Sequence, residues 1–463
     1  MAGIAPRIAQ LTEKLLAAPP PVRIRAWDGS EHGPPGAPVL HIRNRRALRR
    51  SLWRPGELGL ARAWVAGEIT VEGDLYEVLG LVAGLLWDRP PEQPDGAEAG
   101  RARGSTARTA LALARDPAVR GAARELLTLA GPWPPPPPPA EENQGRTGLR
   151  HTLRRDRAAI SHHYDVGNAF YRLVLGPSMV YSCAYWDDPD GADLGTAGPD
   201  AARPDAAGLD AAQHAKLDLI CRKLALRPGQ RVLDMGCGWG SLVLHAAREY
   251  GVHAVGVTLS QEQAVYARKR IAEEGLTERV EVRVQDYREV PDGPYDAIAS
   301  VGMAEHVGSA RYREYADDLY ALLRPGGRLL NHQIARRPQP DESTYEVDRF
   351  IDAYVFPDGE LSPIGRTVGH LEDAGFEVRD LESLREHYAL TLRAWVTNLR
   401  ANWTEAVRHA SPGRARVWEL YMAASALAFE HNRIGVNQVL AVRTPVSGVA
   451  GLPLRARDWR TGA

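Results

Sequence analysis

The feature that most constrains the fold is a regular alternation of apolar strands and amphipathic helices in the second half of the chain. It begins with QRVLDMGCGWG (residues 230–240), an apolar strand that enters a glycine-rich turn, and the helix SLVLHAAREYG (residues 241–251) follows. Strands alternating with helices of this length form a doubly wound, mostly parallel α/β sheet. Further strands are predicted at residues 252–260, 280–290, 295–303, 327–335, 376–384 and 437–445, and a helical excursion at residues 391–407.

A run of six prolines marks the predicted domain boundary. It lies in GPWPPPPPPAEENQGRTG (residues 131–148), and such a run favours extended polyproline II, which acts as a semi-rigid spacer. We therefore place a small α+β domain at residues 1–130, a linker at 131–150 and the alternating α/β domain at 151–463. Two further polar segments rich in Pro and Gly, residues 89–108 and 187–210, are interpreted as loops.

The N-terminal domain contains no catalytic constellation. Residues 23–55 alternate like short strands around turns, and residues 58–87 are typical of amphipathic helices. Its arginines form either a solvated face or a patch for anionic lipid headgroups, and both interpretations stay open here. The clustered arginines are Arg23, Arg25, Arg43, Arg45, Arg46, Arg49 and Arg50.

Composition narrows the class of protein. The formal net charge of -1 and the absence of nucleic-acid-binding motifs argue against a nucleic-acid partner. The three cysteines form no CxxC pair, which is typical of a reduced, cytosolic protein without a metal site. No signal peptide is recognised, and the apolar run at residues 78–87 is about half the length that spans a bilayer.

The glycine-rich turn predicts a nucleotide-containing cofactor. Gly236, Gly238 and Gly240 allow the backbone to approach a ligand closely at the mouth of the first strand, next to Asp234. The spacing is not the GxGxxG of a dinucleotide site, so S-adenosylmethionine is favoured over a nicotinamide cofactor. Asp286, at the end of the third strand, is assigned to the adenine amine. Thr258 and Gln263 are assigned to the ribose hydroxyls, since the second strand does not end in an acidic residue.

Seven ordered motifs resemble one enzyme family. They are HYDVGNAFYRLVLGPSMVYSCAYW, VLDMGCGWGSL, VGVTLSQEQ, VGMAEHVG, NHQI, YVFPDGEL and HYALTLRAW, between residues 161 and 443. Together they are similar to the cyclopropane-fatty-acid synthases, the mycolic acid cyclopropane synthases and related lipid methyltransferases. The resemblance implies a Rossmann-like class I methyltransferase fold, and residues 58–75 resemble the extra N-terminal domain of phospholipid-acting members more weakly. Tyr181, Ser182, Leu259 and Tyr287, in or beside these motifs, are also assigned to the cofactor.

The resemblance implies methyl transfer from S-adenosylmethionine to a cis double bond of an acyl chain. An alkene is a poor nucleophile, so this reaction needs proximity and exclusion of water. Attack leaves a carbocation, which the rings of Tyr164, Tyr181 and Tyr388 are expected to stabilise. The family's base is a bound bicarbonate. By resemblance it is held by Glu305, His332, the hydroxyl of Tyr388 and the backbone N–H groups of Cys183 and Ile334.

Cys183 is therefore interpreted as a wall residue and not as a nucleophile or metal ligand. Two residues depart from the family pattern: Ala304 replaces a bulky aromatic, and Gln333 replaces a smaller residue. Ala304 leaves open the alternative that this protein is a family member that diverts the same cation to a methyl- or methylene-branched product. The complete bicarbonate set nevertheless favours cyclopropanation.

Three function classes remain at this point. The first is a lipid-modifying enzyme that acts on unsaturated phospholipid acyl chains, as a homodimer at the inner face of a bacterial membrane. The second is a methyltransferase for a soluble or carrier-bound natural-product intermediate. The third is a non-enzymatic binder of S-adenosylmethionine or lipid, which the bicarbonate set disfavours because a binder needs no base.

Overall fold

The structure is a computed structural model that describes residues 3–16, 18–87, 117–131, 134–143, 166–187 and 206–452. Two compact units divide the chain, and each is described by itself. Unit 1 comprises Met1–Asn143 and Pro412–Ala424, and unit 2 comprises Gln144–Ser411 and Ser425–Ala463. This division differs from the predicted domain boundary, because residues 134–143 and most of one C-terminal helix fall in unit 1.

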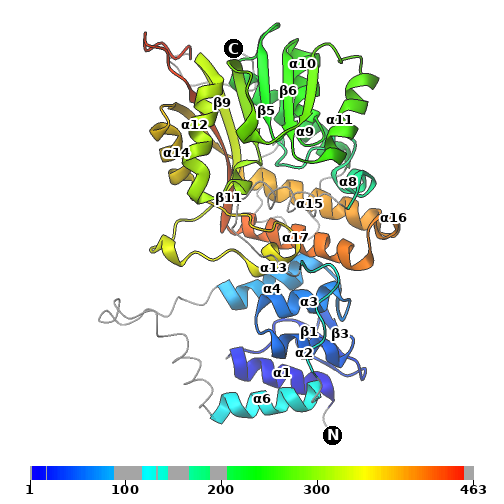
Figure 1. The fold of residues 1–463 in the computed structure, drawn as a ribbon. Helices are drawn as coiled ribbons and strands as arrows, with labels where there is room; N and C mark the ends of the chain where they lie inside the picture. Colours follow the sequence, from blue (N-terminus) through cyan, green and yellow to red (C-terminus); the bar gives the residue numbers. More distant parts are fainter. Residues whose placement is uncertain are drawn as a thin grey trace, which may run out of the picture. The chain divides into compact units, whose positions relative to one another are not determined.

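Unit 1 is a small α/β unit around a four-stranded sheet (Figure 1). The strand order is β2-β1-β3-β4, with β1 and β3 parallel and the other two pairs antiparallel. The apolar sides of the sheet and helices form one core, which includes Ile8, Ile24, Ile42, Leu48 and Ile69. The elements are β1 (Arg23–Ala26), β2 (Glu31–His32), β3 (Val39–Ile42), β4 (Ile69–Glu72), α1 (Ile4–Leu16), α2 (Arg45–Trp53), α3 (Glu57–Val65), α4 (Leu75–Trp87) and α6 (Pro117–Ala130).

Two local predictions for unit 1 were wrong. Arg45–Trp53 is a helix, not a strand, because Asn44 caps its N-terminus by accepting a hydrogen bond from Arg46 N–H, and Ala47 and Leu48 turn toward the core. Ile69–Glu72 is a strand inside the stretch that was predicted to be helical. Its β-branched sequence, ITVE, pairs with β3, so tertiary pairing overrides the helical pattern around it.

Ion pairs occupy much of the N-terminal arginine cluster. Arg50 is buried and donates to both carboxylate oxygens of Glu68, while Arg46 reaches the same carboxylate at 3.2 Å. Arg25 pairs with Glu31 and Glu72. These partners neutralise a large part of the charge that an anionic headgroup would meet, which favours the structural interpretation of the cluster.

The proline-rich segment is bound to unit 1 where the structure describes it. Arg50 donates to the carbonyl of Pro137 at 2.8 Å, and the guanidinium of Arg62 binds both carboxylate oxygens of Glu142. Residues 134–143 therefore pack as part of this unit.

Unit 2 has a seven-stranded sheet with the order β10-β11-β9-β8-β5-β6-β7 (Figure 1). The five strands from β9 to β7 are parallel, and β11 runs antiparallel to both β9 and β10. This confirms the predicted doubly wound, mostly parallel class I methyltransferase fold. The strands are β5 (Arg231–Met235), β6 (His253–Thr258), β7 (Val280–Val284), β8 (Tyr295–Val301), β9 (Leu323–Arg336), β10 (Glu377–Ser383) and β11 (Ile434–Val442).

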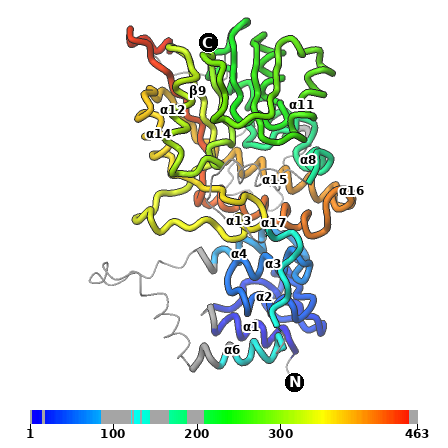
Figure 2. Tube along the Cα trace, in the orientation of Figure 1, coloured from blue at the N-terminus to red at the C-terminus, as the bar shows by residue number. Residues whose placement is uncertain are grey.

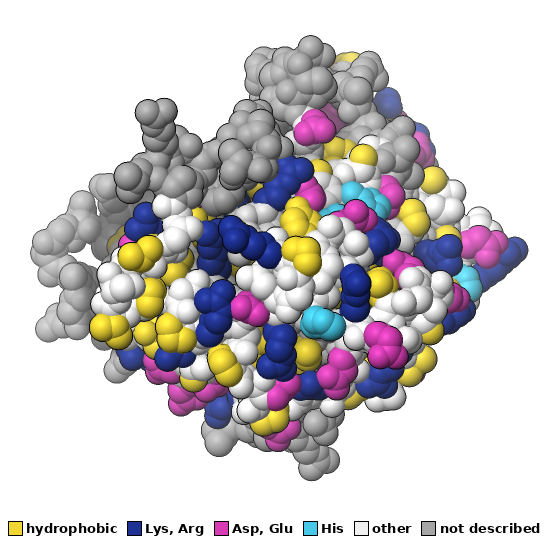
Figure 3. Space-filling model, turned by 90° about the horizontal axis from the view of Figure 1, so that it is seen from above, with side chains coloured by type: hydrophobic (Ala, Val, Ile, Leu, Met, Phe, Trp, Pro, Cys, Tyr) yellow, Lys and Arg dark blue, Asp and Glu magenta, His cyan; other side chains and the backbone are white. Residues whose placement is uncertain are grey.

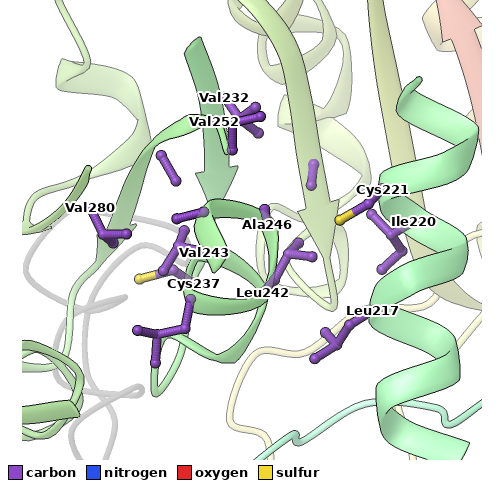
Figure 4. Close-up of a cluster of buried hydrophobic side chains, with 14 of the residues drawn as sticks. Leu217, Ile220, Cys221, Val232, Cys237, Leu242, Val243, Ala246, Val252 and Val280 are labelled. Atoms are coloured by element: carbon purple, nitrogen blue, oxygen red, sulfur yellow. The ribbon is translucent and has the colours of Figure 1, made fainter. Parts of the chain in front are cut away.

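The sheet is buried on both faces. Val232 of β5 packs into a core with Leu217, Cys221 and Leu242, from the helices on one face (Figure 4). Its neighbour Leu233 points the other way, into a second core beneath the helices of the opposite face. The helices are α8 (Asn168–Leu175), α9 (Ala206–Leu224), α10 (Ser241–Tyr250), α11 (Gln261–Glu273), α12 (Tyr312–Leu322), α13 (Arg349–Tyr354), α14 (Ile364–Asp373), α15 (Arg385–Ala401) and α16 (Trp403–His409), with α17 (Pro412–Glu430) shared between the units.

The predicted helical excursion is α15 and α16, which pack beside α8 (Figure 2). On the face of the molecule seen in Figure 3, positive and negative side chains are interspersed. Among the described residues, no helix is both long and apolar enough to cross a bilayer.

Candidate functional site

The glycine turn after β5 is shaped for a ligand. Gly236, Gly238 and Gly240 all have positive φ, at 88°, 53° and 82°. A Cβ on Gly240 would lie 2.9 Å from the Cβ of Ala267, so this glycine is needed for helix packing. A Cβ on Gly238 would meet nothing within 4 Å. Gly238 therefore leaves space at the mouth of β5, as the close approach of a cofactor requires.

Thr258 and Gln263, predicted to bind the ribose, lie together at the end of β6. Thr258 Oγ1 donates to Gln263 Oε1 at 2.8 Å, and this bond fixes the orientation of the amide. The Nε2 group of Gln263 is buried and has no partner among the described residues. A buried, unpaired donor costs free energy unless a ligand uses it, so this amide fits a hydroxyl or ring nitrogen of a nucleoside. Leu259, between them in the chain, is half-buried.

A buried lysine that the sequence analysis missed stands beside the cofactor residues. Lys216 of α9 is 1% exposed and donates to Ser182 Oγ at 2.9 Å. Burial lowers the pKa of Lys216 to about 8, against the opposing effects of Cys183 and Asp234. Burial likewise raises the pKa of Asp234 to about 7, and Lys216 opposes that rise. Each of these two groups therefore opposes the effect of burial on the pKa of the other.

Asp286 has a partner within the protein. Its carboxylate accepts hydrogen bonds from the backbone N–H and the guanidinium of Arg288, at 2.7–3.0 Å. The guanidinium also lies over the ring of Tyr287, which is 9% exposed. The structure therefore gives Asp286 a structural role at the end of β7, and its assignment to the adenine amine stays a prediction.

The turn after β8 carries Glu305 and packs Met303 against the glycine turn. A Cβ on Gly236 would touch Met303 at 3.4 Å, and Gly302 N–H donates to the carbonyl of His332 at 2.8 Å. Glu305 Oε1 accepts a hydrogen bond of 2.8 Å from Ile334 N–H. The other oxygen, Oε2, is buried and has no partner among the described residues. Burial raises the pKa of Glu305 to about 7, although the bond from Ile334 opposes the rise.

This geometry corrects the role expected for Ile334. The resemblance assigned its N–H to bicarbonate, but here the N–H is used to hold Glu305. Ile334 therefore positions the carboxylate, and Glu305 Oε2 is the oxygen that remains available to accept a proton.

His332 offers a second unpaired group. Its Nδ1 lies 3.3 Å from Gln438 Nε2 on β11, and its Nε2 is buried without a partner among the described residues. Burial, helped by the charges of Lys216 and Lys223, lowers the pKa of His332 to about 3. The ring is therefore neutral at physiological pH. When Gln438 donates to Nδ1, Nε2 carries the proton and is a hydrogen-bond donor.

Cys183 and Glu305 are connected through the sheet. Cys183 Sγ donates to the carbonyl of Leu384 at 3.6 Å, and Leu384 N–H donates to the carbonyl of Val436. Val436 lies opposite Ile334 in the β9–β11 register, and Ile334 holds Glu305. The structure thus brings together elements that are far apart in sequence.

The thiol of Cys183 is unsuited to nucleophilic chemistry. Cys183 is fully buried, and burial raises the pKa of its thiol well above the usual value. No group of His, Cys, Asp and Glu in the described part of the chain could hold a metal ion. A buried thiol with a raised pKa fits the predicted wall role of Cys183, and that role stays a prediction.

Aromatic rings gather around Tyr181 and Tyr388. The Tyr181 ring lies 5.9 Å from Tyr171 and 5.4 Å from Trp395, centroid to centroid. Tyr388 lies 6.0 Å from Trp395, and its backbone N–H donates to Leu384, the residue that also contacts Cys183. These rings offer electron-rich faces for a cation. Tyr164, the third predicted tyrosine, lies outside the described residues.

Gln333, one of the two departures from the family pattern, belongs to a buried polar network behind β9. Its Oε1 accepts from the Tyr312 hydroxyl and from Asn331 Nδ2, and its Nε2 donates to Thr367 Oγ1, all at 2.7–2.8 Å. These bonds tie β9 to the neighbouring helices where His332 and Ile334 emerge. Ala304, the other departure, is buried at 4% exposed.

A match to a protein-family model identifies the family of this chain. The model described as mycolic acid cyclopropane synthetase matches residues 151–439. The chain belongs to this family. It is therefore an S-adenosylmethionine-dependent methyltransferase, and the glycine turn and Gln263 described above fit that cofactor.

Relatives that match along most of their length have related names. A probable fatty acid methyltransferase of Mycobacterium tuberculosis is 40% identical, with 94% of each chain covered. A probable fatty acid methyltransferase of Pseudomonas putida is 35% identical over 97% of this chain and 99% of its own. The cyclopropane-fatty-acyl-phospholipid synthase of Escherichia coli is 38% identical, over 62% of this chain and 68% of its own.

Solved structures show the same catalytic fold. The cyclopropane synthase MmaA2 of Mycobacterium tuberculosis is 30% identical with a TM-score of 0.55, over 63% of this chain and 98% of that chain. The mycolic acid cyclopropane synthase CmaA1, in complex with SAH and CTAB, is 32% identical with a TM-score of 0.54, over 62% and 98%.

Proposed function

We propose that the protein is a fatty acid C-methyltransferase that transfers a methyl group to a cis double bond of an unsaturated acyl chain. The observation that supports this best is the arrangement of Glu305, whose Oε1 is held by Ile334 N–H while its buried Oε2 has no partner in the described structure. A carboxylate with a pKa near 7 suits proton removal at neutral pH. Methylation of an alkene requires such a step, because the cation it forms must lose a proton.

The side chains around this carboxylate serve the earlier steps. S-adenosylmethionine supplies the electrophilic methyl group when bound. Tyr181, Trp395 and Tyr388 present ring faces that stabilise positive charge on the acyl chain. The burial of Trp395 and Tyr388 excludes water, which would otherwise trap the cation as an alcohol.

Bicarbonate fits the polar groups that remain. Glu305 Oε2 is an acceptor for its hydroxyl, and neutral His332 donates through Nε2. The Tyr388 hydroxyl and the Cys183 N–H complete the set that would hold it. Bound there, bicarbonate would supply the base, with Glu305 receiving the proton in turn.

A methylene-branched chain is the proposed product, and a saturated methyl branch would form from it only with a separate hydride donor. Relatives that match over nearly the whole of this chain are named fatty acid methyltransferases, and a tuberculostearic acid methyltransferase of Mycobacterium tuberculosis is 31% identical over 96% of this chain. Ala304, which stands where the family pattern has a bulky aromatic, agrees with a product other than the ring.

Cyclopropanation is the second candidate, because the same cation closes to a ring when the delivered methyl loses the proton. The observation that favours it is that Glu305, His332, Cys183 and Tyr388 are all present and their supporting contacts connect. The two outcomes share methyl transfer and the first cation. Ring closure accompanies loss of a proton from the methyl group, whereas a methylene branch first needs a hydride shift that moves the positive charge to the methylated carbon.

We further propose that the acyl chain is esterified in a phospholipid and that the enzyme acts as a homodimer at a membrane surface. Since unit 1 neutralises much of its arginine cluster internally, apolar contact should contribute more to membrane binding than charge does. Binding to vesicles should then fall only modestly as salt rises, and a steep fall would point to the basic patch instead.

Expression of the gene in a host that makes cis-monounsaturated fatty acids tests the proposal. Total fatty acids, released from lipids and analysed by mass spectrometry with fragmentation, should contain chains enlarged by one carbon at the former double bond. Fragmentation distinguishes branch from ring. Host chains that stay unmodified while the purified enzyme methylates a soluble carrier-bound substrate would contradict the phospholipid assignment.

A further inference from the structure

Two side chains of α9 hold the same residue of the segment that precedes Cys183. Gln213 Nε2 donates to the backbone carbonyl of Ser182 at 3.0 Å, and Lys216 Nζ donates to the Ser182 hydroxyl at 2.9 Å. Residues three apart share one face of a helix, so one face of α9 fixes both the backbone and the side chain of Ser182. Gln213 and Lys216 are 0% and 1% exposed.

The bond to the Ser182 carbonyl also determines the direction of the Cys183 N–H. The Ser182 C=O and the Cys183 N–H belong to one peptide unit, which is planar. This peptide is trans, since the one cis peptide in the described chain joins Gly293 and Pro294. In a trans peptide the C=O and N–H bonds point in opposite directions. A donor on α9 that holds the carbonyl therefore points the Cys183 N–H away from α9.

Packing alone does not explain a glutamine at position 213. Its Oε1 is buried and has no partner among the described residues, which costs free energy that a methionine or leucine of similar size would avoid. The side-chain amide is useful at this position because its Nε2 group donates to the Ser182 carbonyl. Donation to a carbonyl also polarises the peptide and strengthens the N–H at its other end as a donor.

We propose that Gln213 is a positioning residue that directs the Cys183 N–H into the anion site beside Glu305 and His332. This inference rests on the proposed function, in which that site holds bicarbonate. The contacts of Cys183 and Ala184 on the other side agree with it: Ala184 N–H donates to Thr391 Oγ1, and Cys183 Sγ contacts Leu384. The segment is thus fixed from both sides.

The three cysteines of the chain allow a direct test. Protein labelled with nitrogen-15 only at cysteine gives three amide signals, and a Cys183→Ser sample identifies the one from Cys183. Bicarbonate is titrated into the full-length protein saturated with S-adenosylhomocysteine. The Cys183 amide proton should shift downfield and saturate, while Cys221, in the last turn of α9, serves as the internal reference.

Gln213→Met removes the donor and keeps the side-chain volume. The bicarbonate dissociation constant read from the Cys183 signal should rise about 2- to 10-fold, and its limiting shift should shrink. Thr391→Val is the matched control, since it removes the bond to the next peptide and leaves the Ser182–Cys183 peptide held. Its effect on bicarbonate affinity should be clearly smaller.

Gln213→Glu keeps the inference testable if Gln213→Met does not fold. A protonated carboxyl can donate to the Ser182 carbonyl and an ionised one cannot, so bicarbonate affinity relative to wild type should fall as pH rises. Unchanged affinity in both variants would overturn the role of Gln213 and leave the anion site intact. An equal loss in Thr391→Val would show general loosening and also overturn it. If the Cys183 amide signal of the wild-type protein does not shift when bicarbonate is added, the proposed anion site itself is overturned, together with this inference.

Discussion

Glu305 Oε1 accepts a 2.8 Å hydrogen bond from the backbone N–H of Ile334, which joins the turn after β8 to strand β9. The bond has two consequences. It orients the carboxylate so that only Oε2 is left to interact with another group, and it does so with a neutral donor, so the pKa of Glu305 stays raised at about 7. A carboxylate held by an arginine would have a lowered pKa and would be a weaker proton acceptor.

Glu305→Gln should therefore bind S-adenosylmethionine nearly as wild type does but turn over about 10²- to 10⁴-fold more slowly. The amide keeps an acceptor for Ile334 N–H and loses the ability to receive a proton. Calorimetric titration with the cofactor and single-turnover kinetics separate the two effects. Loss of cofactor affinity with normal turnover would assign Glu305 to the cofactor site instead.

The raised pKa of Glu305 predicts opposite pH trends for activity and stability. Activity should rise with pH through about 7, because the ionised carboxylate is the active form. Stability should fall as the pH rises from about 4.5 to about 7 and level off above that, since a carboxyl whose pKa rises from 4.5 to about 7 on folding binds its proton more tightly in the folded state. Melting temperatures of the wild type and of Glu305→Gln are measured between about pH 5 and about pH 8. The melting temperature should decline less steeply with pH in the variant. Identical slopes would place the titration on another group.

Lys216→Met should weaken S-adenosylmethionine binding about tenfold. Without the ammonium, Asp234 lacks its counter-charge and takes up a proton near neutral pH. Asp234→Asn introduced into the Lys216→Met variant should weaken cofactor binding little further, because the two groups act together. Lys223→Met is the matched control: that lysine is equally buried but pairs with Glu382 and Asp380. The Lys223→Met variant should be less stable than wild type but keep its affinity for the cofactor. Equal losses of affinity in the Lys216 and Lys223 variants would contradict the role given to Lys216 and Asp234.

Cys183→Ser should retain substantial activity. The backbone N–H is unchanged, and a hydroxyl can donate to the carbonyls of Ala184 and Leu384 as the thiol does. Activity assays are paired with a melting curve, so that unfolding is recognised. Complete inactivation of a folded variant, or a methylated or acylated Cys183 found by mass spectrometry, would restore the nucleophile hypothesis.

The sequence was sufficient for the parallel core of unit 2. An apolar run such as Arg231–Met235 that enters a glycine turn has few alternatives to a buried strand, and the structure has β5 there. The elements of unit 1 were harder, because they are short and their patterns conflict. Asn44 begins a helix within an apparent strand alternation, and Ile69–Glu72 becomes a strand only through pairing with β3.

The candidate site shows the same limit. Glu305, His332 and Cys183 were found by motif resemblance, whereas Gln213 and Lys216 were not predicted. The available signal was weak: two polar residues, three apart, on a helix face shared with apolar side chains. Their partner Ser182 lies about thirty residues earlier, so only tertiary structure shows which peptide they hold. The same holds for Ile334, whose N–H was expected to face bicarbonate and instead holds Glu305.

The most direct test of the central claim uses S-adenosylmethionine with a trideuterated methyl group and vesicles of a cis-monounsaturated phospholipid. The account predicts that label enters the acyl chain at a former double-bond carbon, survives saponification, and keeps two of three deuteriums if the delivered methyl loses the proton in forming a ring or methylene. Saturated phospholipid should stay unlabelled, and Glu305→Gln should label far more slowly. Label that saponification releases, or equal labelling of saturated chains, would contradict methyl transfer to an alkene carbon.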